Sequence, residues 1–133
     1  MIVALLFYSV FIYLAHAKVS DDLMDDWNAV ASTYADECIE ESEANPIVAK
    51  NMFKNHKLHD EEHIQCFIKC LNYKLKFLTD VGVYDKERFV NTLQHVTREI
   101  VDKCVEKHKF ETNECKNSYL VAACFAEENY ITE

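Results

Sequence analysis

The chain of 133 residues contains only one glycine, Gly82, and one proline, Pro46. A β-sheet domain of this size needs many tight turns, and tight turns depend on these two residue types. Glu, Lys, Ala and Leu, which favour helices, are abundant instead. The sequence therefore predicts an all-α fold. We find no internal repeat and no low-complexity linker, so we expect a single domain.

The first 17 residues have the pattern of a secretory signal peptide. Residues 2–14 carry no acidic or basic side chain, and Ala15 and Ala17 are the small residues that signal peptidase accepts. The apolar run is shorter than the roughly 18–20 residues that a membrane-spanning helix needs. We expect residues 1–17 to be a signal peptide and residues 18–133 to form one secreted, extracellular domain without stable membrane insertion.

The charge of the chain excludes two classes of partner. The formal net charge is −9, and Arg88 and Arg98 are the two arginines. Nucleic acid binding needs a basic surface that follows the phosphates, and binding to anionic membranes needs a Lys/Arg cluster beside an amphipathic stretch. Neither pattern occurs, so we expect neither partner.

Apolar residues recur every three or four positions in several stretches, as in amphipathic helices. The apolar stretch 119–126 covers a helix all the way round, so we expect the other helices to surround it. Five to six helices are predicted, with a break at Gly82. Five can be placed: about 21–44, 46–55, 61–78, 86–108 and a last helix that contains 119–126. Pro46 is placed to open the second helix, and the expected N-caps of the other four are Ser20, Asp60, Asp85 and Thr112.

The stretch HKLHDEEHIQCFIKC contains a candidate metal site. On one continuous helix its histidines and cysteines would lie within roughly 80° of one another, and HDEEH fits the H-x-x-E-H pattern of inverted zinc proteases. The five residues are His56, His59, His63, Cys66 and Cys70. Secretion favours disulfides over free thiolates, and an N-cap at Asp60 would interrupt the helix. We therefore predict no metal, no other cofactor and no enzymatic activity.

Six cysteines follow the signal peptide, and an even number in a small secreted chain indicates three disulfides. They are Cys38, Cys66, Cys70, Cys104, Cys115 and Cys124. Cys66 and Cys70 lie one helical turn apart, too far for a relaxed bridge. Cys115 and Cys124 face opposite sides of their helix and lie about 13 Å apart along it. Excluding these two pairs leaves ten of the fifteen possible pairings.

The cysteine spacing C-x27-C-x3-C-x33-C-x10-C-x8-C resembles that of the insect odorant-binding proteins, the general odorant- and pheromone-binding family. The gaps of three and eight residues are the most specific marks of that family, and the resemblance covers the chain after the signal peptide. It implies the interlocked pairs Cys38–Cys70, Cys66–Cys115 and Cys104–Cys124. This set is among the ten that the helical geometry permits.

The resemblance also implies a function: a compact helical bundle, stapled by three disulfides, that carries a small hydrophobic ligand such as an odorant or pheromone in an apolar cavity. An olfactory receptor is an implied further partner, and the protein is expected to be a monomer or weak homodimer. The predicted cavity residues come chiefly from the third, fourth and last helices, with some from the first helix and the C-terminal segment. They are Phe67, Leu71, Leu75, Phe89, Leu93, Val96, Tyr119, Leu120, Ala123, Trp27, Val30, Tyr34, Tyr130 and Ile131.

Two other functions remain open from the sequence. The same carrier could act outside olfaction, in saliva, venom or haemolymph. A cytokine-like helical bundle would have a filled core and act through its surface. If the protein is a carrier, protonation of the histidine cluster His56, His59 and His63 is expected to loosen a helix end or a loop and to weaken ligand binding.

Overall fold

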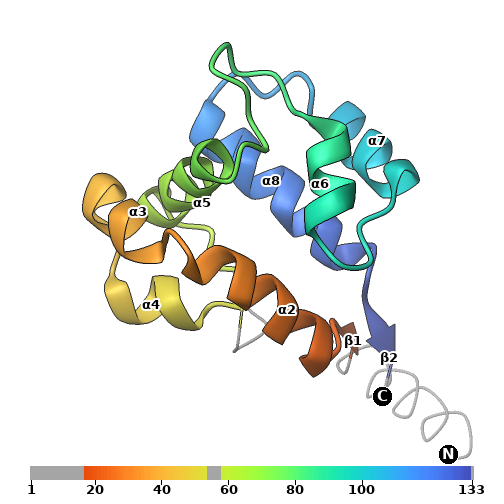
Figure 1. Cartoon of the computed structure of the whole chain (residues 1–133), viewed down its shortest axis with the longest axis horizontal. Coiled ribbons are helices and arrows are strands. Elements are labelled where there is room, and N and C mark those ends of the chain that lie inside the picture. Colours follow the sequence, from red (N-terminus) through yellow and green to blue (C-terminus); the bar gives the residue numbers. More distant parts are fainter. Residues whose placement is uncertain (1–16, 54–57, 133) are drawn as a thin grey trace, which may run out of the picture.

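The computed structural model describes residues 17–53 and 58–132, and within these ranges it confirms the all-α prediction (Figure 1). Seven helices occur there, together with one short antiparallel pair of strands. The helices are α2 (Asp21–Ser32), α3 (Ala35–Ser42), α4 (Pro46–Asn51), α5 (Glu62–Lys74), α6 (Lys86–Thr92), α7 (Arg98–Lys107) and α8 (Glu114–Glu127). The strands are β1 (Ala17–Lys18) and β2 (Ile131–Thr132).

Helices α5 and α8 pack against each other in the middle of the molecule (Figure 1). Helix α3 packs on α5, and α7 on α8, while α2 lies on the side of the molecule where β1 and β2 pair. The last helix thus lies between α5 and α7, although much of its apolar stretch 119–126 is only half-buried. None of the helices in the described ranges is long and apolar enough to span a membrane.

The first predicted helix, 21–44, is in fact two helices. The backbone N–H groups of Thr33 and Tyr34 bond to carbonyls three residues back, and the Ser32 hydroxyl donates to the carbonyl of Ala29 at 2.8 Å. Hydroxyl side chains that bond to nearby backbone compete with the helical ladder. The chain therefore turns between α2 and α3, and the prediction of one continuous helix was wrong.

The fourth predicted helix is also divided, because residues 93–97 leave the helical path between α6 and α7. His95 has a left-handed backbone, with φ 59°, and Thr97 caps α7 by accepting a hydrogen bond from a backbone N–H of its first turn at 3.2 Å. The indole N–H of Trp27 donates to the carbonyl of Gln94 at 3.0 Å. This contact fixes the connecting segment against α2, and no local sequence pattern reveals it.

Helix α5 ends earlier than predicted, and Gly82 is not the residue that ends it. Lys76 adopts a left-handed backbone, with φ 65°, where glycine is the usual residue. The N–H groups of Phe77 and Leu78 both donate to the carbonyl of Asn72, at 2.8 and 3.0 Å. These bonds close the helix end, and Gly82 lies in the loop that follows.

Two N-caps are displaced by one residue from the prediction. Glu61, rather than Asp60, caps α5 by accepting a hydrogen bond from the N–H two residues further on. Asn113, rather than Thr112, caps α8 through its side-chain oxygen. The second predicted helix ends with α4, and its last two predicted residues, 54–55, lie outside the described ranges.

Gly82 is required by the loop between α5 and α6. Its φ is 79°, and an added Cβ would lie 3.1 Å from Glu114 Oε1. The same oxygen accepts a 2.6 Å hydrogen bond from the Tyr73 hydroxyl, so it is not free to move away. We expect Gly82→Ala to lower the free energy of unfolding by about 1–2 kcal/mol, measured by urea denaturation.

The matched control for this prediction is Val81→Ala in the same loop. Val81 is 84% exposed, so its truncation is expected to change stability by less than about 0.5 kcal/mol. If Gly82→Ala is as stable as Val81→Ala, the left-handed backbone does not constrain this loop.

Candidate ligand-binding site

The buried apolar side chains form two clusters instead of one continuous core. The first lies among α2, α6, α7 and α8 and includes Trp27 and Phe89. The second lies among α3, α4 and α5 and includes Ile64 and Met52. Side chains from both clusters face a shared space, the apolar cavity, which has a volume of about 290 Å³.

The apolar cavity is surrounded by α2, α5, α6 and α8 and by the segments that follow α4 and α5. Its volume is at the lower end of the range for small-molecule sites, roughly 300–1,000 Å³. The space therefore suits a small apolar molecule or one medium-length hydrocarbon chain.

Nine of the fourteen predicted cavity residues line this space. Five different parts of the fold bring them together: α2, the C-terminal end of α5, the α6 region, α8 and the segment before β2. They are Trp27, Val30, Leu71, Leu75, Phe89, Leu93, Tyr119, Ala123 and Tyr130.

The other five predicted residues lie elsewhere. Phe67 is 1% exposed and belongs to the second cluster, and Val96 is buried in the first. Tyr34 packs against the second cluster, where the turn between α2 and α3 rotates it out of the stripe of α2. Leu120 is half-buried on α8 without lining the cavity, and Ile131 is 45% exposed in β2.

Several lining residues were missed by the sequence analysis, including Phe77 and Phe125. Phe77 stacks on Phe89 with 4.4 Å between ring centroids, and Phe125 meets Phe89 edge-on at 5.0 Å. Such aromatic pairs add to the stability gained from burial. Phe77 enters the wall because the left-handed turn at Lys76 reverses the chain, and that turn is not evident from sequence. Phe125 could have been predicted, since it lies in the apolar run of the last helix.

Two buried polar residues line the interior of the cavity, Asn72 on α5 and Ser118 on α8. Asn72 is 8% exposed and Ser118 is 1% exposed, and the Ser118 hydroxyl has no hydrogen-bond partner among the described residues. An unpaired buried hydroxyl is unfavourable, and a partner brought by a ligand removes that cost. The Ser118 hydroxyl can therefore bond to a hydroxyl or carbonyl group of a bound molecule.

The cavity reaches the surface near the C-terminal end of α8. Glu127 and Tyr130 line it and are exposed, and Tyr119 lies beside them. The pKa of the Tyr119 hydroxyl is raised, first by burial and then by the negative charges of Asp60 and Glu127. We call Asp60, Tyr119, Glu127 and Tyr130 the rim. Two of its four members are carboxylates.

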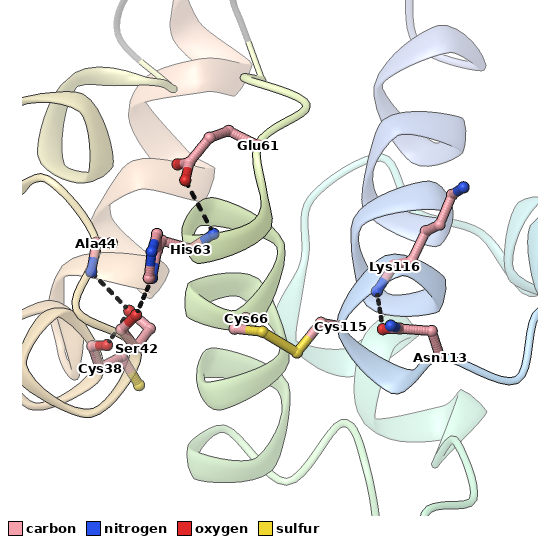
Figure 2. Close-up of a disulfide and its surroundings, with 9 residues drawn as sticks. All are labelled: Cys38, Ser42, Ala44, Glu61, His63, Cys66, Asn113, Cys115 and Lys116. Carbon is pink, nitrogen blue, oxygen red and sulfur yellow. Dashed lines mark hydrogen bonds between the residues drawn. A yellow bond between two sulfur atoms is a disulfide. The ribbon is translucent and has the colours of Figure 1, made fainter.

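Three disulfides hold the helices around the cavity. Cys38–Cys70 lies in the second cluster and Cys104–Cys124 in the first. Cys66–Cys115 joins α5 to α8, which pack against each other and both contribute to the cavity wall (Figure 2). The pairing is the one that the family resemblance implies. Each bridge restricts the unfolded chain, by about 3–4 kcal/mol for loops of these lengths.

The candidate zinc site does not form, because Cys66 and Cys70 are both in disulfides. His56 lies outside the described ranges. The ring of His63 points away from the Cys66–Cys115 bridge, and its Nδ1 lies 2.9 Å from the carbonyl oxygen of Ser42 at the end of α3 (Figure 2). His63 thus connects the beginning of α5 to the end of α3.

The pKa of His63 is raised above its ordinary value of 6.5, chiefly by the hydrogen bond to the Ser42 carbonyl. Burial lowers the pKa by less than that hydrogen bond raises it, and the carboxylates of Glu61, Glu43 and Glu62 raise it further. The protonated ring therefore stabilises the fold. That contribution is complete below pH 6.5 and is lost as pH rises through the raised pKa. For His63 this reverses the prediction that protonation loosens a helix end.

We expect His63→Gln to be less stable than the parent protein at pH 5.5, because glutamine can donate to the same carbonyl but carries no charge. The difference is expected to shrink by pH 8.5, where the parent histidine is neutral as well. Urea midpoints of both proteins across this pH range measure the effect. A difference that stays constant with pH would contradict a charged His63 contact.

Together, the helices, the three disulfides and the apolar cavity define a class of protein: small helical binding proteins with an internal hydrophobic site. The sequence model of the PBP/GOBP family matches residues 20–128. This chain belongs to the PBP/GOBP family, whose members are carriers and not enzymes. Its six cysteines form three disulfides, as expected for insect odorant-binding proteins.

Neither a search of curated proteins nor a search of solved structures gave a match to this chain. The family match covers the residues from the N-cap of α2 to the end of α8. It therefore includes all six cysteines and most of the cavity wall.

Proposed function

We propose that this protein is a secreted carrier that binds one small hydrophobic molecule, an odorant or pheromone, in the apolar cavity. The observation that carries the proposal is the space of about 290 Å³ between two separately packed clusters. A filled core, as a cytokine-like bundle requires, would have merged these clusters. Membership of the PBP/GOBP family supports the same function.

The mode of binding follows from the lining residues. Burial of the hydrocarbon part supplies most of the affinity, at about 25 cal/mol per Å². We propose that the nine predicted residues in the wall contact this part of the ligand. Ser118 would bond to a neutral polar group such as a hydroxyl, carbonyl or ester, which discriminates such ligands from pure hydrocarbons.

A fluorescence titration tests the proposal. Trp27, the only tryptophan of the chain, lines the cavity, so the neutral fluorophore N-phenyl-1-naphthylamine should quench it as the probe's own emission rises. We expect saturation at one probe per chain and displacement by 1-decanol with a dissociation constant near 1 μM. That affinity is about −8 kcal/mol, or about 0.7 kcal/mol per ligand atom, an ordinary value for small ligands.

The control is the same protein with its disulfides reduced in urea. Adding the probe to this unfolded protein should neither quench the tryptophan fluorescence nor increase the emission of the probe. Absence of saturable binding to the folded protein would refute the carrier function. The olfactory role is tested separately, by locating the protein in tissue. Its presence in saliva, venom or haemolymph instead of sensory lymph would assign the same carrier to another fluid.

We also propose that the mature chain begins at Lys18, after cleavage behind Ala17. In the structure Lys18 pairs with Ile131 in the strand pair β1–β2. The new amino terminus would then lie beside the segment that follows Tyr130. N-terminal sequencing of the exported protein checks the cleavage site.

A further inference from the structure

The rim of the cavity differs in charge from its interior. Of the lining residues that the structure describes, Glu127 is the one with a full charge, and none is Lys, Arg or His. Asp60 adds a second carboxylate close to Tyr119. Glu128, the neighbour of Glu127, does not line the cavity and is paired with Lys103 at 2.6 Å.

The interior cannot accept a charged group. Its walls are apolar apart from the neutral side chains Asn72 and Ser118, and moving an unpaired charge into such surroundings costs several kcal/mol or more. Ser118 and Glu127 are nine residues apart on α8, or about 13 Å along the helix axis. A ligand with a charged head must therefore place its chain inside and its head at the rim.

We propose that the rim selects ligands by the charge of their head group: this carrier accepts an alkyl chain with a protonated amine and rejects the matching fatty-acid anion. The inference rests on the proposed carrier function. At the rim an ammonium group gains attraction to Glu127 and Asp60 and can donate to the Tyr119 hydroxyl. A carboxylate in the same place is repelled by both acids, and no Lys, Arg or His side chain of the described residues lines the cavity to attract it.

The size of the effect follows from exposure. Two unit charges a few ångströms apart near a protein surface interact by about 1–4 kcal/mol, less where water screens them. Since Glu127 and Asp60 are both exposed, we take the lower end of this range. Reversing the charge of the head group should then change the dissociation constant by about tenfold.

Three ligands with the same ten-carbon chain test the inference: 1-decylamine, 1-decanol and decanoate. At pH 7.5 the amine is protonated and the acid is ionised. Each is titrated as a competitor of N-phenyl-1-naphthylamine at low ionic strength. We expect decylamine to bind about tenfold more tightly than decanoate, with decanol between them, and the ratio to shrink in 0.5 M NaCl.

Glu127→Gln should reduce the ratio of amine to acid affinity to about threefold or less and leave decanol binding unchanged. Glu128→Gln, the matched control, removes the same charge one residue away and should leave the ratio at about tenfold. Unchanged decanol binding also shows that each variant is folded.

The inference is overturned if decanoate binds as tightly as decylamine, or if the two variants have the same ratio. In those cases decanol still binds and the carrier function stands. If none of the three ligands competes, the carrier function itself fails, and the inference fails with it.

Discussion

Replacing Cys66 and Cys115 together by alanine is expected to lower the free energy of unfolding by about 4 kcal/mol. The bridge joins residues 49 positions apart, the largest separation of the three, so its loss frees the most chain entropy in the unfolded state. It also ties together α5 and α8, two adjacent helices that both line the cavity. We therefore expect affinity for N-phenyl-1-naphthylamine to fall together with the urea midpoint.

The comparison for this variant is the double replacement of Cys104 and Cys124. That bridge spans 20 positions, so the expected loss is smaller, about 3 kcal/mol. It joins α7 to α8 inside the first cluster, so probe binding by the protein that remains folded should change less. If both double variants lose stability and affinity equally, the α5–α8 bridge has no special part in holding the cavity.

Ala122→Phe is expected to weaken binding of 1-decanol by about 10- to 100-fold. Ala122 lies on α8 in the cavity wall, and a phenyl ring there fills space that the ligand needs. Forcing a guest beside it costs about 1–3 kcal/mol, as overpacking of a core does. Stability without ligand should change by less than about 1 kcal/mol, because the ring enters an existing space.

Ala29→Phe is the matched control for this variant. Ala29 is exposed on α2 and does not line the cavity, so decanol should bind this variant as it binds the parent protein. A loss of several kcal/mol in the stability of Ala122→Phe, with affinity unchanged, would mean that the region is a filled core.

The sequence predicted the helical class and the general positions of the helices because these depend on local features. Apolar periodicity and the scarcity of glycine and proline are both local. The breaks at Tyr34 and in residues 93–97 were not predicted, because the apolar stripes continue through them. The second break depends on the Trp27–Gln94 contact, which joins parts of the chain 67 residues apart.

The cavity wall was predicted in part for the same reason. Residues on the apolar stripes of α2, α5 and α8, such as Trp27 and Leu71, line the cavity. Phe67 lies on the same stripe of α5 as Leu71, so the periodicity of the sequence does not distinguish the two. Which of the two faces the space depends on how α3 and α8 pack on α5. Asn72 was not predicted as a lining residue, because a polar residue beside a buried apolar stripe gives no signal of its own in a single sequence.

The most direct test of the central claim, that the interior holds one apolar guest, is calorimetric titration of 1-decanol into the mature chain at several temperatures. The account predicts one site per chain, and a binding enthalpy that becomes more negative on warming, since burial of apolar surface lowers the heat capacity. Titration without saturable heat, or binding with the same constants in Ala122→Phe, would contradict it.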